Sequence, residues 1–365
     1  MKILRIACMF GGFLSLVLSL SAQTFTTLHN FDGTDGSQVF PGLVQAANGD
    51  LYGATADGGA NSNRDCVANC GTVFKITLAG KLTTLYSFCS QSGCSDGAEP
   101  QATLLQDTNG NLYGTTFILG ANGGGTVFKI SLGGKLTTLY NFCSLSGCTD
   151  GEAPLAGLVQ GTDGNFYGTA TQGGTNGYGT VFSITPSGTL TTLYSFGPYG
   201  SPEATLVLAT DGNFYGTTAS GGTEGDGTIF NITPSGEETT LHTFDGTDGV
   251  FPAAALVQDT NGTFYGTAPL GGANSDGTVF SLSVGLEPFV KALPAAGKVG
   301  AEVGILGTSL TGATNVYFNG IPAQFKVVSS TLILTDVPGG ATTGTITVTL
   351  PGQTLSSNVP FFVLK

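Results

Sequence analysis

Eight aspartates stand in segments rich in Gly, Ser and Thr between apolar runs, where carboxylates could do chemistry. Paired carboxylates can hydrolyse glycosidic bonds, and carboxylate oxygens can bind calcium. The sequence Asp-Gly-Thr-Asp-Gly at 32–36 and again at 245–249 is the best candidate for calcium. Asp and Gly also form turns readily, and we favour that interpretation. The candidate binding residues are Asp32, Asp35, Asp65, Asp96, Asp150, Asp226, Asp245 and Asp248.

Six cysteines after residue 8 form three local pairs. An even number of cysteines in an exported chain predicts disulfides. A zinc site is the alternative, but the two histidines, His29 and His242, lie elsewhere in the sequence. We therefore predict the disulfides Cys66–Cys70, Cys89–Cys94 and Cys143–Cys148.

The two histidines stand at a position that tyrosine fills elsewhere. His29 and His242 align with Tyr86, Tyr140 and Tyr194 in similar segments. They are therefore expected to be substitutions at a structural position. The sequence lacks a catalytic Ser-His-Asp arrangement, a phosphate-binding glycine loop and a zinc-binding helix motif. No catalytic residue is therefore assigned.

These residues lie within five copies of one sequence unit. Gly-Thr-Val/Ile-Phe begins at 71, 125, 179, 227 and 277, and a Tyr-Gly pair precedes it each time. Each complete copy contains four short segments that are rich in β-branched and aromatic residues. In order they are a, similar to Leu-Val-Gln; b, similar to Phe-Tyr-Gly-Thr; c, similar to Gly-Thr-Val-Phe-Lys-Ile-Thr; and d, similar to Leu-Thr-Thr-Leu-Tyr-Ser-Phe. Asn-Gly or Asp-Gly separates a from b in all five copies, which predicts two-residue type I′ hairpins. The repeating aromatics are expected to pack between copies.

Repeats of about 50 residues with four strands are typical of propeller blades. Segment d appears alone at 25–31, and the fifth copy ends after segment c near residue 283. We predict an all-β fold: a five-bladed β-propeller of four-stranded blades closed by the N-terminal strand, plus a C-terminal immunoglobulin-like β-sandwich. In that fold the b-to-c and d-to-a loops, with the predicted disulfides, share one face. We call it the long-loop face and take it as the candidate functional surface.

The N-terminus and the composition indicate export. Lys2 and Arg5 precede an apolar run from 10 to 20, which predicts a signal peptide over 1–22 and no membrane span after its cleavage. The remaining chain has 9 basic against 24 acidic residues, a formal charge of −15. We therefore predict no nucleic-acid partner, and an anionic membrane surface would be a poor partner. We expect a secreted or cell-surface monomer.

The residues also resemble known families. The segments 156–169 and 179–188 look like the GloVer tandem-repeat family of exported bacterial proteins, a resemblance that covers 23–285 and implies no particular activity. The strand order is also similar to propellers of the NHL and streptogramin-lyase type. Lyase chemistry would require a His near the channel, whereas His29 and His242 fall on the predicted outermost strand. Residues 286–365 resemble an IPT/TIG domain.

Three functions remain open. The first is a non-catalytic extracellular or cell-surface propeller that binds a glycan or a protein through the long-loop face. The alternative is a carbohydrate-active lyase or hydrolase that uses the loop carboxylates. The third is a purely structural envelope protein. No cofactor is predicted apart from a possible calcium ion.

Overall fold

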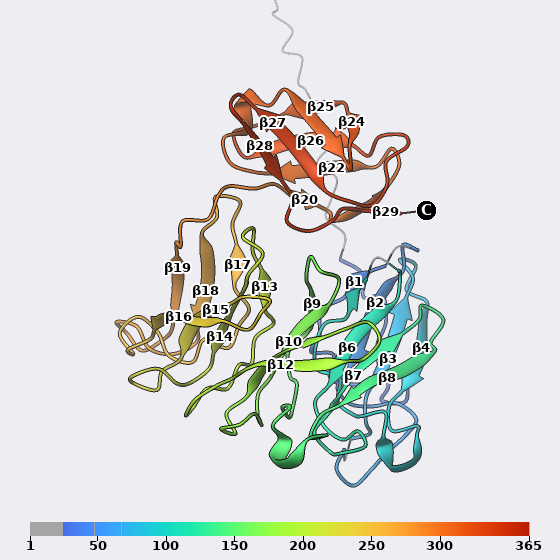
Figure 1. Cartoon of the computed structure of the whole chain (residues 1–365). Helices are drawn as coiled ribbons and strands as arrows, with labels where there is room; N and C mark the ends of the chain where they lie inside the picture. Colours follow the sequence, from blue (N-terminus) through green and yellow to red (C-terminus); the bar gives the residue numbers. More distant parts are fainter. Residues whose placement is uncertain (1–24, 47, 67, 108, 365) are drawn as a thin grey trace, which may run out of the picture.

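The computed structural model describes residues 25–364, apart from 47, 67 and 108. The predicted signal peptide therefore lies outside the described residues. The described chain is all-β, as predicted (Figure 1). Its three short 3-10 turns are η1 (Ser92–Cys94), η2 (Ser146–Cys148) and η3 (Leu310–Gly312). In this part of the chain no helix has the length and hydropathy to cross a membrane.

Each sequence repeat folds as one antiparallel meander, because short β-branched segments alternate with tight turns. The first sheet contains β1 (Val44–Gln45), β2 (Leu51–Thr55), β3 (Thr72–Ile76) and β4 (Leu82–Ser87), and the second contains β5 (Leu105–Gln106), β6 (Leu112–Thr116), β7 (Thr126–Ile130) and β8 (Leu136–Asn141). The third contains β9 (Val159–Gln160), β10 (Phe166–Ala170), β11 (Thr180–Ile184) and β12 (Leu190–Ser195), and the fourth contains β13 (Val207–Leu208), β14 (Phe214–Thr218), β15 (Thr228–Ile232) and β16 (Glu238–Thr243). The fifth has three strands, β17 (Val257–Gln258), β18 (Phe264–Ala268) and β19 (Thr278–Leu282).

The hairpins between the first two strands of each sheet differ from the predicted turn type. A two-residue type I′ turn needs positive φ at both central residues. Only the glycine has it here: φ is 82° at Gly164, and Asp163 is not among the positive-φ residues. The Gly164 amide donates to the Gly161 carbonyl at 3.1 Å, and the Gly161 amide donates to Asn165. The loop is therefore a three-residue turn ending in a left-handed glycine, because aspartate keeps the cheaper negative φ.

Aromatic side chains pack the sheets against one another, as predicted. Phe88, which directly follows β4 of the first sheet, contacts Phe128 of the second sheet edge-on, with ring centroids 5.2 Å apart. Tyr167 of the third sheet stacks on Phe214 of the fourth at 4.0 Å. These rings are almost completely buried. Since each sheet needs its neighbour to cover its aromatic face, the repeats form a continuous propeller-like array.

The predicted ring closure is not formed in the structure. Among the described residues, β19 pairs only with β18, and residues 25–31 form no strand. The N-terminal segment instead lies on the first sheet, where Phe31 contacts Phe74 with ring centroids 5.2 Å apart. The arc of sheets ends before β19 reaches that segment (Figure 1). The array is therefore open at β19 in this structure, and the sealed five-bladed ring stays a prediction.

The C-terminal residues form a β-sandwich around one hydrophobic core. One sheet contains β20 (Lys291–Leu293), β22 (Glu302–Leu306), β26 (Leu332–Asp336) and β25 (Phe325–Val327). The other contains β24 (Ile321–Ala323), β23 (Asn315–Phe318), β27 (Ile346–Leu350) and β28 (Gln353–Ser356), while β21 (Ala296–Lys298) pairs in parallel with β29 (Phe362–Leu364). Alternate side chains point into the core, as the buried and exposed alternation along β27 shows.

This sandwich lies over one end of the sheet array. The Asn358 side-chain amide donates to the Leu208 carbonyl at 3.1 Å, and the Phe289 amide donates to the Thr260 carbonyl at 3.0 Å. Both acceptors belong to the short strands and tight turns that begin each repeat. The long loops, including η1 and η2, lie at the opposite end of the array (Figure 1). The long-loop face is therefore uncovered by the sandwich.

Candidate functional site

The long-loop face is assembled from paired loops. At each junction, the loop that enters a sheet meets that sheet's own b-to-c loop. Backbone hydrogen bonds join Ser37 to Asp57, Glu152 to Gln172 and Val250 to Leu270 at 2.8–3.4 Å. The predicted gathering of these two loop types on one face is therefore present, although the ring is open.

Two of the candidate aspartates are buried inside these loops. The Asp150 carboxylate accepts hydrogen bonds from the Tyr140 hydroxyl at 2.8 Å, from the Ser144 amide and hydroxyl, and from the Leu145 amide. Asp96 has the same set of donors in the preceding junction. Burial is the main reason that the pKa of Tyr140 is raised, and the Asp150 carboxylate adds to the effect. Both aspartates hold their loops together, because four donors fill each carboxylate.

Two further aspartates pair with the histidines. His29 Nε2 lies 2.6 Å from Asp35, and His242 Nε2 lies 2.7 Å from Asp248. These pairs repeat the geometry of Tyr140 and Asp150, with histidine in place of tyrosine. His242 belongs to β16, the outer strand of its sheet, as predicted.

The remaining candidates lie in separate turns. The Asp32 and Asp245 carboxylates accept from the hydroxyl and amide of Thr34 and Thr247, and these bonds lower the pKa of both carboxyls. Asp65 pairs with exposed Arg64 at 3.5 Å. The Asp226 carbonyl accepts from the Phe251 amide at 2.9 Å. Two pairs of candidates do lie together: the Asp32 amide donates to the Asp35 carboxylate, and the Asp245 amide donates to the Asp248 carboxylate, both at 3.1 Å. The eight aspartates do not form one site.

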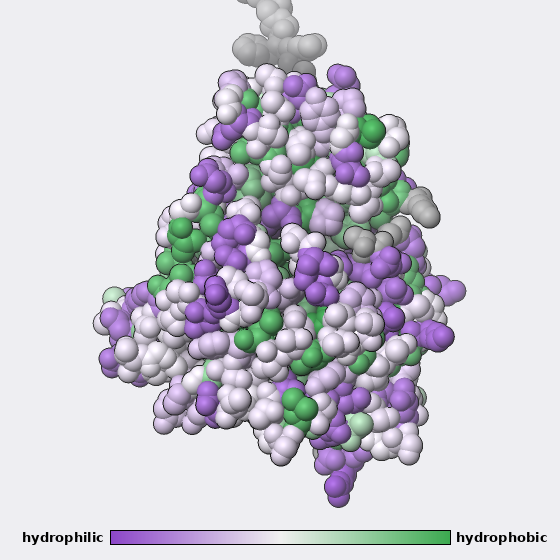
Figure 2. Space-filling view, in the orientation of Figure 1, coloured by the Kyte–Doolittle hydropathy of each residue, from purple (hydrophilic) through white to green (hydrophobic). Residues whose placement is uncertain are grey.

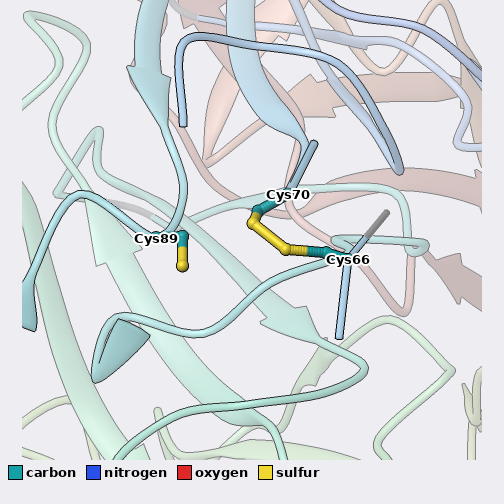
Figure 3. A group of neighbouring side chains, drawn as sticks. All are labelled: Cys66, Cys70 and Cys89. Carbon is teal, nitrogen blue, oxygen red and sulfur yellow. A yellow bond between two sulfur atoms is a disulfide. The ribbon is translucent and has the colours of Figure 1, made fainter. Parts of the chain in front are cut away.

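The six cysteines are joined in the three predicted pairs. Cys66, Cys70 and Cys89 lie in one cluster where the first b-to-c loop meets the next d-to-a loop (Figure 3). Cys143 and Cys148 lie beside Glu152. Across the described residues, each group of three close potential metal ligands contains such bonded cysteines. Cysteine binds a metal as a thiolate, which a disulfide sulfur does not offer. In the disulfide-bonded form, the clusters therefore stiffen the loops.

A pocket that was not predicted lies between the third and fourth sheets. It has a volume of about 300 Å3, and its walls include Tyr194, Gly200, Thr228 and Glu238. Tyr199 lies in the loop that forms one wall, and its ring is 5.7 Å from that of Tyr178. The sequence signal was available: residues 197–201 are the one d-to-a loop without an aspartate.

Comparisons with known proteins give two family matches. The model of the Gloeobacter/Verrucomicrobia repeat matches residues 15–206 and 198–318, and the IPT/TIG domain model matches residues 288–363. No relative was found among curated proteins.

Solved structures with a similar arrangement are distant in sequence. A gluconolactonase from Xanthomonas campestris is 13% identical, with a TM-score of 0.42 over 84% of this chain and 88% of its own. A putative gluconolactonase is 13% identical, with a TM-score of 0.40 over 90% and 92%. A luciferin-regenerating enzyme is 14% identical, with a TM-score of 0.39 over 70% and 94%.

Proposed function

The chain belongs to the Gloeobacter/Verrucomicrobia repeat family and carries an IPT/TIG domain, and from this premise we propose that it is a non-catalytic extracellular or cell-surface binding protein. Its ligand is a glycan or a protein that contacts the long-loop face. The C-terminal sandwich is the spacer or adhesion module. The protein acts as a monomer.

The observation that carries this proposal is the placement of the sandwich. It contacts the tight-turn end of the array through Asn358 and Phe289, and the opposite end remains free. The free end contains the loops that differ most between repeats, on a scaffold of buried aromatic contacts. Variable loops on a rigid scaffold are the usual location of binding sites.

The state of the loop carboxylates favours binding over hydrolysis. An acid for glycoside cleavage needs an accessible proton and a second carboxylate across the scissile bond. Asp96 and Asp150 are buried with four donors each, and Asp35 and Asp248 are occupied by histidine. These groups serve to order the loops.

Three local disulfides support an extracellular location, because they persist in oxidising compartments. The family match is consistent with the same location.

We also infer that the two ends of the array join to make a five-bladed ring. Val279 of β19 is 80% exposed, whereas its equivalents Val73, Val127 and Val181 are fully buried. Hydrophobic side chains gather near that edge at the left of Figure 2. At the other end, the Leu28 carbonyl lies against Gly80, as the Leu85 carbonyl lies against Gly134. Residues 25–31 thus lie beside the first sheet in the position that the fourth strand of a preceding sheet would take. The fifth sheet is the one without a fourth strand, and its edge strand is β19.

The chain from residue 23 should be tested on glycan and protein arrays, with and without calcium, and on a panel of polysaccharides for turnover. The proposal expects binding on one array and no turnover. Turnover that disappears in loop Asp→Asn variants would replace it with a lyase or hydrolase. Two empty arrays would replace it with a structural envelope role.

A further inference from the structure

The d-to-a loop between the third and fourth sheets differs from the other four d-to-a loops. Each of the other four inserts an Asp-Gly pair against the sheet that follows it. The Asp35 carbonyl accepts from Thr72 at 3.2 Å, and the Asp248 carbonyl accepts from Thr278 at 2.7 Å. The following glycines, such as Gly97, leave no room for a Cβ against the threonines of the next sheet. We call this Asp-Gly insertion the wedge.

The d-to-a loop that follows the third sheet has no wedge. Residues 197–201 read Gly-Pro-Tyr-Gly-Ser, and they are two residues shorter than their counterpart, residues 245–251. The threonines that the wedge would contact, Thr218, Thr228 and Thr240, instead line the pocket of about 300 Å3. Thr240 is exposed, whereas its equivalents Thr84, Thr138 and Thr192 are half-buried. The pocket therefore lies at the position that the wedge fills beside each of the other sheets.

The pocket walls carry hydrogen-bonding groups and one charge. The Glu238 carboxylate accepts from the Thr240 hydroxyl at 3.1 Å, and the Tyr194 hydroxyl also faces Glu238. Thr228 bonds to Thr218 at 2.7 Å and retains a second lone pair. A carboxylate and several hydroxyls together can accept from and donate to the hydroxyl groups of a ligand.

Two exposed tyrosines lie at the loop that forms one pocket wall, where Pro198 and Gly200 flank Tyr199. Tyr199 and Tyr178 are 67% and 36% exposed, with their ring centroids 5.7 Å apart. The Ser201 amide donates to the Tyr178 carbonyl at 2.9 Å, which fixes the two segments together. An exposed aromatic pair beside a polar pocket offers an apolar face for a ring and a polar wall for its substituents.

We propose that this pocket binds a neutral sugar residue of a glycan. This inference rests on the proposed binding function and specifies the site of that binding. Its volume is in the range of small-ligand pockets. The ring of a sugar would lie against Tyr199, and its hydroxyls would donate to Glu238. Because Glu238 is the one charged side chain among the pocket walls, an anionic sugar would be repelled.

The test is a titration of the chain from residue 23 with trisaccharides of glucose, galactose and mannose, and with trigalacturonate. At least one neutral trisaccharide should bind, and trigalacturonate should bind at least tenfold more weakly. Glu238→Gln and Tyr199→Ala should each weaken binding about tenfold. Glu237→Gln is the matched control, since it is the adjacent exposed glutamate outside the pocket, and it should leave binding unchanged.

A loop exchange gives a second, independent variant. Replacing residues 197–201 with the sequence of 245–251 restores the wedge and should abolish binding while the melting temperature is kept. Binding that survives the exchange, or that prefers trigalacturonate, overturns the pocket proposal. If the arrays show a ligand but the pocket variants bind it normally, only the pocket proposal fails. If no glycan or protein binds at all, the proposed function fails with it.

Discussion

The Tyr140 hydroxyl donates a 2.8 Å hydrogen bond to the carboxylate of Asp150, which lies ten residues further along the chain. The same relationship joins Tyr86 to Asp96, and histidine replaces tyrosine beside Asp35 and Asp248. A tyrosine or histidine side chain in segment d thus fixes the loop that inserts toward the next sheet. The third repeat keeps the ring, Tyr194, but lacks the aspartate, and there the pocket appears.

Removing a wedge carboxylate should destabilise the repeats. Asp150→Ala leaves the Tyr140 hydroxyl and two backbone amides without their acceptor, at a cost of about 2 kcal/mol. For a unit of this size, that lowers Tm by roughly 4–8 °C. Thermal unfolding followed by circular dichroism measures the change. The control Asp65→Ala removes an exposed carboxylate and should shift Tm far less; equal shifts would disprove the structural role of Asp150.

Alkaline pH should also weaken the repeats. Burial raises the pKa of Tyr113, Tyr167 and Tyr215 to about 12, and neighbouring aspartates contribute. A raised folded-state pKa means that the folded chain holds these protons more tightly than the unfolded chain, whose tyrosines ionise near pH 10. The stabilisation is complete below pH 10 and is lost as pH rises toward 12. Tm and tyrosinate absorbance should both be measured from pH 9 to 12 to check this loss of stability. Ionisation of all tyrosines near pH 10 without unfolding would contradict the prediction.

Much of the fold follows from local sequence signals. The Asn-Gly and Asp-Gly pairs locate the hairpins because a left-handed residue is needed there, and Gly164 has that conformation. They do not determine loop length, so the turn type was mispredicted. The cysteine pairs are separated by only four or five residues, and such proximity is enough to predict their bonding.

Contacts across a junction were harder to predict. The sequence suggests turns for Asp96 and Asp150 but does not indicate that Tyr86 and Tyr140 donate to them. Closure depends on the angle accumulated over five sheets, which no local pattern encodes. The pocket arises from a missing segment, so it becomes visible only when residues 197–201 are aligned with the equivalent loops.

Reducing the disulfides should loosen loops without unfolding the array. Each bond closes a short segment, so its loss costs at most about 2 kcal/mol. Arg64 lies in the same b-to-c loop, two residues before Cys66, and its side chain is 90% exposed. Trypsin should therefore cleave at Arg64 faster after reduction, while far-UV circular dichroism is kept. Loss of the β signal on reduction would show that the bonds maintain the whole fold.

Ring closure predicts a specific cross-link. In the complete sheets, Val73 is opposite Tyr86 and Ile229 is opposite His242. By the same register, Val279 should lie opposite His29 in a closed ring. The double variant His29→Cys/Val279→Cys should form an intramolecular disulfide in the monomer, with His29→Cys alone as the control. Cross-linking only between molecules would contradict closure.

Deleting the N-terminal segment tests closure by a second route. Removal of residues 25–31 should lower Tm by many degrees, because Phe74 loses its contact with Phe31 and, in a closed ring, β19 would also lose the strand beside it. Phe31→Ala, which removes the ring contact with Phe74 but keeps the segment, is the control and should lower Tm less. An unchanged melting curve would disprove the closure.

The most direct test of the proposed binding face is amide hydrogen exchange of the whole chain with and without a ligand identified on the arrays. Protection is expected in the long loops, above all in residues 171–179 and 197–206, with no change in the tight turns such as 161–165 or in the C-terminal sandwich. Protection confined to those turns or to residues 288–363 would contradict the account.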